Sequence, residues 1–366
     1  MSHHFDITPP EEDISDVFCF AGPSDDDGPR TVIGMNASPK TGAPWDPNTF
    51  YELKLDLDDD LVEEITWRFT FSQADANGKQ TMQVAELTGA DATNRAAPGK
   101  IIVGPDAPTG KVYEVKGVKI FADKRLDSFF TDIRVPFNVR SVLPPGPNAP
   151  LQSPTADPGL FELRQPFTDT FAGQTVRTVI VELPARITGL DPIQCWGTTA
   201  FGDQAHGWTQ VQRAAIPDVS VVFDNGGDPY LTTINSTGPS VDLAGRPANP
   251  ETGDASGTVW GTIRDQVALV VKTLGTYNQG VNGKATPMAY GAWAADTLLP
   301  NVLRFTPGTT ALWDAWNGVK NGKGLYEELA SNFAKVIINQ DFSTKLTQTE
   351  KFTPYFPYLL APPPDS

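Results

Sequence analysis

The chain has 366 residues, with 44 acidic and 28 basic side chains, and its formal net charge is −16. A nucleic-acid or anionic-membrane partner requires a basic surface on the protein, and this net charge argues against one. Neither partner is therefore expected. The 32 glycines and 33 prolines follow no collagen-like period, and 39% of the residues are hydrophobic. The composition therefore predicts a folded body rich in strands and loops.

Up to about residue 255, short apolar runs alternate with turns rich in glycine, proline and asparagine. The segment Tyr51–Asp58 places Tyr51, Leu53, Leu55 and Leu57 on one face, as a half-buried strand does. Strands this short, joined without helical spacers, are typical of an antiparallel sandwich or barrel-like body. The expected strands cover residues 31–36, 51–58, 65–71, 79–87, 111–121, 176–183, 208–214 and 219–223.

After residue 256 the apolar spacing becomes helical. Val259, Ile263, Val267, Val270 and Val271 share one helix face, and Leu274-Gly275 supplies a stop signal. Further helices are expected over residues 288–299 and 325–338. The sequence thus predicts a mainly β fold in one domain, residues 1–366, with a β body over about 1–255 and helical additions over about 256–340.

Two features bear on the compartment. Residues 1–20 contain no apolar leader segment, and the chain has no apolar stretch of membrane-spanning length. The two cysteines, Cys19 and Cys195, form no closely spaced pair, and they are expected to be buried, reduced thiols. Together these features predict a cytoplasmic protein.

Histidine is scarce, and two of the three histidines, His3 and His4, are adjacent at the N-terminus. Acidic residues, including Asp6 and Asp16, follow them closely. Imidazole and carboxylate groups are the usual ligands of divalent transition metals. His3, His4, Asp6 and Asp16 are therefore candidate metal ligands, and the alternative interpretation is a solvated terminus.

The chain opens with SHHFD, followed by DISDVFCF. Further ordered motifs are FYELKLDLDDDLVEEITWRFTF (50–71), VKIFADKRLDSFFTD (118–132), FAGQTVRTVIVELP (171–184), WTQVQR (208–213) and FPYLLAPP (356–363). Together these motifs, which extend through nearly the whole chain, resemble the bacterial domain of unknown function 4331 family, and SHHFD and DISDVFCF resemble its start.

The resemblance implies a single, largely β domain and no settled activity. Two departures are present. The family stretch has Asp-Asp-Pro-Phe-Phe where this chain has Leu126-Asp127-Ser128-Phe129-Phe130. Many relatives carry an export signal that this chain lacks, which favours an intracellular role. The family-typical position of the N-terminal histidines and acids strengthens their interpretation as a metal site, because a polar cluster is costly to bury unless it is paired or ligated.

A second candidate metal site follows the expected strand 51–58. Asp56, Asp58 and Asp60 share one face of an extended segment, with Asp59, Glu63 and Glu64 beside them. Carboxylate oxygens at this density suit Ca²⁺, although the loop lacks the glycine that an EF-hand needs at its sixth position. A solvated acidic turn is the alternative.

Candidate catalytic residues are Asp127, Asp132 and His206. Two acids beside aromatic residues suit a general acid with a raised pKa and its charged partner, or Asp127 caps a short helix. His206 is a structural residue unless it folds against His3 and His4. Phe129, Phe130, Trp208 and Arg213 are the candidate lining of a substrate pocket.

Common catalytic motifs of hydrolases, zinc proteases and nucleotide-binding proteins are absent from the sequence. Two functions remain open. The first is a metal-dependent enzyme, with oxidative chemistry favoured, that acts on a small apolar or aromatic molecule. The second is a β protein without catalytic activity that binds a small molecule or a partner. Stabilisation of the protein by Ca²⁺ is a further idea, independent of ligand binding. The substrate, the metal and the oligomeric state do not follow from the sequence.

Overall fold

The structure is a computed structural model, and it describes residues 13–37, 43–136, 139, 166–223, 229–348 and 351–363. Within these ranges most strands belong to two antiparallel sheets. Sheet A has the strand order β1-β2-β9-β8-β7, and sheet B has the order β11-β10-β3-β4-β5-β6, with β12 beside β10. The strands of sheet A are β1 (Ile14–Asp25), β2 (Gly28–Ala37), β7 (Tyr113–Val115), β8 (Val118–Leu126) and β9 (Thr175–Pro184). The strands of sheet B are β3 (Thr49–Asp56), β4 (Ile65–Phe71), β5 (Thr81–Thr88), β6 (Lys100–Pro108), β10 (Ile193–Asp203), β11 (Gly207–Ala214) and β12 (Leu303–Phe305).

The two sheets pack against each other through alternate residues of β1 and β2 in sheet A and of β10 in sheet B. Val17 and Met35 of sheet A face Gly197 of sheet B, because a Cβ atom added to Gly197 would lie 3.3 Å from Val17 Cγ2 and 2.5 Å from Met35 Sδ. Leu53 and Trp67 of sheet B are completely buried in the same core. The period of two that the sequence shows in strands β3 and β4 thus creates the apolar faces that form a sandwich-like core.

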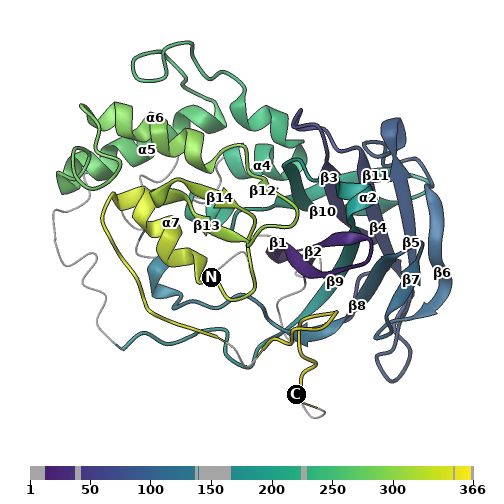
Figure 1. The fold of residues 1–366 in the computed structure, drawn as a ribbon. Coiled ribbons are helices and arrows are strands. Elements are labelled where there is room, and N and C mark those ends of the chain that lie inside the picture. The colour runs from purple at the N-terminus through teal and green to yellow at the C-terminus, as the bar shows by residue number, and fades with distance from the viewer. Residues whose placement is uncertain are drawn as a thin grey trace.

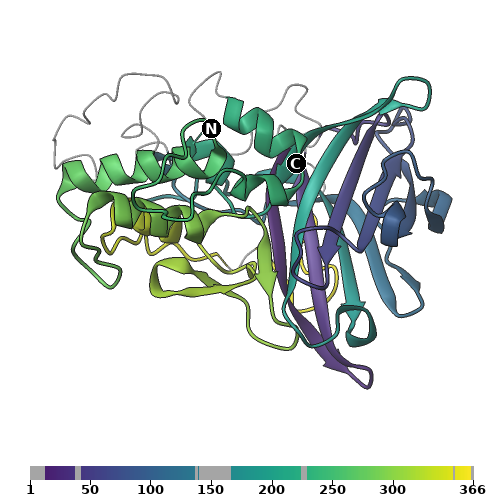
Figure 2. The ribbon, with the colours of Figure 1, turned by 90° about the horizontal axis from the view of Figure 1, so that it is seen from above.

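Helices come mainly from the last third of the chain, and α5 and α6 gather at one side of the molecule while β4, β5 and β6 lie at the other (Figures 1 and 2). Core residues of the helices and of both sheets belong to one continuous cluster. The helices are α2 (Ala185–Thr188), α3 (Val219–Phe223), α4 (Pro229–Ser236), α5 (Val259–Leu274), α6 (Pro287–Leu298) and α7 (Leu329–Ile338), and 3-10 turns cover Gly89–Asp91, Pro239–Leu243 and Ala315–Asn317. A small hairpin joins β13 (Leu312–Asp314) and β14 (Val319–Asn321).

The prediction of a mainly β, antiparallel fold with helices from the C-terminal third is confirmed. Helix α5 begins after Thr258, whose side chain accepts a hydrogen bond from the Gly261 N–H, and ends at Gly275 in a left-handed conformation. The expected strand over 219–223 is wrong, because this run forms helix α3. The Val222 N–H donates to the Asp218 carbonyl at 2.9 Å, so the backbone turns helically at the start of the run.

None of the described helices combines the length and the apolar character needed to cross a membrane. Helix α5, with 16 residues, contains Arg264, Asp265 and Lys272. Its apolar face packs against α6 and α7, which explains its helical spacing of valines without any reference to lipid.

Candidate functional site

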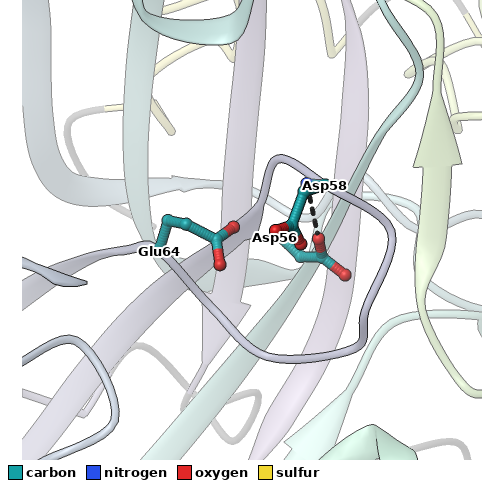
Figure 3. Close-up of side chains that lie close together, drawn as sticks. All are labelled: Asp56, Asp58 and Glu64. Atoms are coloured by element: carbon teal, nitrogen blue, oxygen red, sulfur yellow. Dashed lines mark hydrogen bonds between the residues drawn. The ribbon is translucent and has the colours of Figure 1, made fainter. Parts of the chain in front are cut away.

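The turn between β3 and β4 brings three carboxylates together. One ligand oxygen from each of Asp56, Asp58 and Glu64 can lie within 4.8 Å of the others, so this group can hold a metal ion. Figure 3 shows the Glu64 carboxylate directed toward Asp56 and Asp58 from the far side of the turn. The expected third member, Asp60, is replaced by Glu64 in this group, because the chain bends at Asp59 and Leu61, which both have a positive φ.

The acidic turn (Asp56, Asp58 and Glu64) is held in place by backbone hydrogen bonds. The Asp56 carboxylate accepts from the N–H groups of Asp58, Asp59 and Leu61 at 3.1, 2.8 and 2.8 Å. The Glu64 carboxylate accepts from the Leu57 N–H at 2.7 Å. Burial raises the pKa of both Asp56 and Glu64, and neighbouring carboxylates raise it further. A bound cation would relieve this repulsion between like charges.

A second polar group lies on the face of sheet A that points away from sheet B. Asp16 of β1 pairs in register with Asn36 of β2, which pairs with Thr178 of β9, so the three side chains form a row across the sheet. The Thr178 hydroxyl donates to Asn36 Oδ1 at 2.7 Å. Asn36 Nδ2 donates to Ser128 Oγ at 2.7 Å, and the Ser128 hydroxyl donates to Asp16 Oδ2 at 2.6 Å.

Lys323 completes this buried polar cluster (Asp16, Asn36, Ser128, Thr178 and Lys323). Its Nζ atom contacts Asp16 Oδ1 at 2.6 Å and Oδ2 at 2.5 Å, and both side chains are almost completely buried. The backbone of Lys323 is fixed beside β1 by a reciprocal pair of hydrogen bonds with Cys19, at 3.1 and 2.9 Å. The aromatic ring of Phe129 lies 5.9 Å from the ammonium group.

Further acids surround the buried polar cluster. Burial raises the pKa of Asp127 to about 7, against the lowering effect of the Lys351 charge. Burial, together with the charges of Glu328 and Asp16, raises the pKa of Asp218 to about 7. Burial also raises the pKa of Glu328, whose carboxylate accepts from the Thr131 hydroxyl. Carboxyl groups that titrate near neutral pH can both donate and accept protons, so this arrangement suits acid–base chemistry.

A groove of about 600 Å³ lies beside the cluster. Its walls are largely apolar and are formed by β1, by the segment before β13, by residues 324–327 and by the C-terminal segment. Residues 324–327 line the groove, and they lie between Lys323 and Glu328 in the chain. Because Lys323 belongs to the buried polar cluster, this short segment joins the groove to the cluster. Its larger apolar and aromatic lining residues are Phe20, Pro23, Leu325, Tyr326, Pro354 and Tyr358.

Two polar groups reach this groove. The Glu327 carboxylate accepts from the N–H groups of Trp313 and Gly324 at 2.8 and 2.7 Å, and burial raises its pKa. The Tyr358 hydroxyl donates to Glu182, which also pairs with Lys119 at 2.7 Å. The groove therefore combines aromatic walls with a carboxyl group held by the backbone, which is the usual composition of a small-molecule site.

The structure brings together only part of the residues that the sequence singled out. Asp16, Asp127 and Phe129 gather at the buried polar cluster, and Phe130 is buried two residues before Asp132. Asp132 caps the turn that follows it, because its carboxylate accepts from the Arg134 N–H at 3.0 Å. Burial by itself would raise the pKa of Asp132. The hydrogen bond and the charge of the Arg134 guanidinium outweigh this effect, so the pKa of Asp132 lies below its usual range. His3, His4 and Asp6 lie outside the described residues.

The remaining candidates belong to sheet B. The side chain of His206 is 84% exposed at the tip of the β10–β11 hairpin, where its Nδ1 lies 2.9 Å from Asp203. His206 thus lies at the surface, whereas Asp127 is completely buried. Trp208 stacks on Phe50. Arg213 is buried and pairs with Asp242 at 2.5 Å, so its guanidinium ties β11 to the segment that precedes α5.

Sequence reasoning missed Lys323, Asp218, Glu328 and Glu327. Lys323 stands between two glycines near the C-terminus, and no periodic pattern indicates that it returns to β1, 307 positions away. Asp218 was overlooked because the residues directly after it, 219–223, were wrongly predicted to form a strand. Glu328 falls inside the expected helix 325–338, whereas the observed helix starts at Leu329 with Glu328 as its cap.

Comparisons with protein-family models, with curated proteins and with solved structures found no match. The resemblance to the domain of unknown function 4331 family therefore stays a prediction.

Proposed function

We propose that this protein binds a small, largely apolar or aromatic molecule in the groove beside the buried polar cluster. The observation that carries this proposal is a groove of about 600 Å³ whose walls are mainly aromatic and aliphatic. Its volume falls in the range of small-molecule sites in proteins, about 300–1,000 Å³. The Phe20 and Tyr358 rings meet edge to face at 5.2 Å, so they form a wall suited to an aromatic ligand.

The polar groups of the groove indicate which chemical group the ligand should carry. Glu327 keeps an acceptor position on each carboxylate oxygen, because each oxygen uses only one of its lone pairs for a backbone N–H group. A ligand hydroxyl or amine group would satisfy these positions. The net charge of −16 disfavours an anionic ligand, so the proposed ligand is neutral or cationic.

The test uses a neutral fluorescent probe, N-phenyl-1-naphthylamine, whose emission rises in an apolar site. Ala311 lines the groove, so Ala311→Trp fills it, whereas Leu190→Trp adds the same ring at a turn where Leu190 is 63% exposed. We expect the wild type and Leu190→Trp to bind the probe equally, and Ala311→Trp to bind it at least about tenfold more weakly. Equal binding by all three proteins would contradict the proposal.

A second candidate function is catalysis at the buried polar cluster. Two buried acids, Asp127 and Asp218, have their pKa raised to about 7, and Lys323 and Glu328 bound the segment that lines the groove. Groups tuned to neutral pH beside a small-molecule site favour proton transfer to or from the bound molecule. In this proposal Asp127 acts as the general acid or base, and Phe129 shields it from water.

The metal-dependent, oxidative form of this proposal meets an obstacle at Asp16. Both oxygens of that carboxylate accept from Lys323, and Oδ2 also accepts from Ser128. An ammonium group thus takes the place that a cation would need, so Asp16 does not fit the role of a metal ligand. His3 and His4 remain untested ligands, and metal analysis of the wild type beside a His3→Ala/His4→Ala variant would test them.

Catalysis is tested with any molecule that competes with the fluorescent probe. The molecule is incubated with the wild type, with Asp127→Asn and with Asp75→Asn, and products are followed by mass spectrometry. Asp75 is an exposed turn acid on another hairpin, so it serves as the control. Turnover by the wild type and Asp75→Asn, with a loss of at least about 100-fold in Asp127→Asn, supports catalysis. Unchanged turnover in Asp127→Asn would show that Asp127 is not the general acid or base of the reaction.

We also propose that the acidic turn binds an ion, that this ion is Ca²⁺, and that it stabilises the β3–β4 connection. Ca²⁺ prefers carboxylate oxygens and accepts irregular geometry, as Asp56, Asp58 and Glu64 offer it. The role is structural, because the turn is fixed by hydrogen bonds of its own backbone.

A further inference from the structure

Two cysteines from different sheets meet in the core. Cys19 belongs to β1 of sheet A and Cys195 to β10 of sheet B, and both are completely buried. The Cys195 thiol lies close enough to Cys19 to influence the pKa of the Cys19 thiol. They are the only cysteines of the chain, so any bond between thiols of one molecule joins this pair.

The packing of the neighbouring residues shows why the thiols meet. Side chains alternate along a strand, so Val17 shares the face of Cys19 and Gly197 shares the face of Cys195. Val17 itself faces Gly197, since a Cβ atom on Gly197 would lie 3.3 Å from Val17 Cγ2. Moving two residues along each strand in opposite directions leads from this contact to the contact between Cys19 and Cys195.

Gly197 allows the two strands to approach closely. Facing sheets usually lie about 10 Å apart, whereas a disulfide requires Cα atoms about 4.4–6.8 Å apart. A Cβ atom at Gly197 would lie only 2.5 Å from Met35 Sδ, so a larger residue would require the Met35 side chain to move. Cα atoms of β1 and β10 do approach within 8 Å of each other.

We propose that Cys19 and Cys195 form an intramolecular disulfide that links the two sheets when the protein folds under oxidising conditions. A small disulfide such as oxidised glutathione is the oxidant. One cysteine thiolate attacks it, forms a mixed disulfide and releases one small thiol. The second cysteine thiolate then attacks the sulfur of the first cysteine and releases the other small thiol. The protein loses two hydrogen atoms, and the oxidant gains them.

Burial determines when this reaction takes place. Neither cysteine is exposed in the folded state, and burial raises the pKa of the Cys19 thiol. Thiol exchange requires an accessible thiolate, so the folded, reduced protein reacts slowly. The bond therefore forms during folding, or through transient separation of the sheets, and it is then protected from reducing agents by the same burial.

The test refolds the denatured full chain in a buffer of reduced and oxidised glutathione, followed by acid quench, alkylation and mass spectrometry. We expect a monomer that has lost about 2 Da relative to the reduced chain and has no thiol left to alkylate. The control, Cys19→Ser refolded in the same way, should retain one cysteine that is alkylated or carries glutathione. Two alkylated cysteines, or a separate glutathione on each, in refolded wild type would overturn the proposal.

Discussion

Lys323 holds both carboxylate oxygens of Asp16 at 2.6 and 2.5 Å, although the two residues lie 307 positions apart in the chain. This contact ties the segment before α7 to the first strand of sheet A. Lys323 directly precedes Gly324, which lines the groove. The pair therefore connects the fold of the C-terminal third with the candidate site.

We expect Lys323→Met to lower the free energy of unfolding by about 3–5 kcal/mol, because it leaves the buried Asp16 carboxylate without its counter-charge. The control is Arg246→Met, which removes a pair with Asp296 whose side chains are 39% and 38% exposed. That change should cost about 1 kcal/mol or less. Urea denaturation measures both values, and similar costs for the two variants would show that the buried pair has no special weight.

The pH dependence of stability should reveal the carboxyl of Asp127. Its pKa is raised to about 7 in the folded protein, so the unfolded chain releases this proton first as the pH rises from about 4 to about 7. Asp127 therefore lowers stability progressively across that window, and Asp127→Asn should gain on the order of 2–4 kcal/mol relative to wild type between pH 5 and pH 8.

The control for this pH dependence is Asp75→Asn. Hydrogen bonds from the Lys79 and Asn77 N–H groups hold the pKa of Asp75 below its usual range, so its contribution is lost only as the pH falls through the acidic range. Unfolding curves of Asp75→Asn should parallel those of the wild type between pH 5 and pH 8. A parallel course for Asp127→Asn as well would mean that this acid is ionised throughout.

At the acidic turn, Asp58→Asn should weaken Ca²⁺ binding by about tenfold, which corresponds to about 1.4 kcal/mol. Without Ca²⁺ the same variant should be as stable as the wild type or more stable, because the Asp58 charge disfavours the charged form of Glu64. Calorimetric titration measures the affinity, and melting curves with Ca²⁺ or with a chelator measure the stability. Asp75→Asn again serves as the control, and a chelator-independent melting temperature of the wild type would exclude a bound ion.

Gly197→Ala should lower the free energy of unfolding by about 1–3 kcal/mol, because the new methyl group would overlap Met35 between the sheets. Gly238→Ala provides a matched control, since a Cβ atom there meets no atom within 4 Å and its φ of −77° suits any residue. The control should stay within about 0.5 kcal/mol of wild type. If both variants unfold alike, the sheets tolerate a wider separation at Gly197.

Local patterns predicted the elements whose apolar period is long and regular. The hairpin over β3 and β4 and the helix α5 follow directly from periods of two and of 3.6 residues. The run 219–223 was misassigned because five residues, four of them apolar, are too few to reveal a period. Strand β10 escaped notice because Gly197 and three threonine or alanine residues interrupt its apolar pattern, although it lies between β3 and β11 in sheet B.

The sequence by itself determined the fold class, the acidic character of the chain and the carboxylate density near Asp56, because these depend on composition and on neighbours along the chain. Only the tertiary structure decided that Glu64 rather than Asp60 joins Asp56 and Asp58, that Lys323 faces Asp16, and that Cys19 meets Cys195. These contacts join residues through a bent turn, through a return of the chain to β1 and through the packing of two sheets. No local period encodes such distances, because they arise only when the apolar faces are buried together.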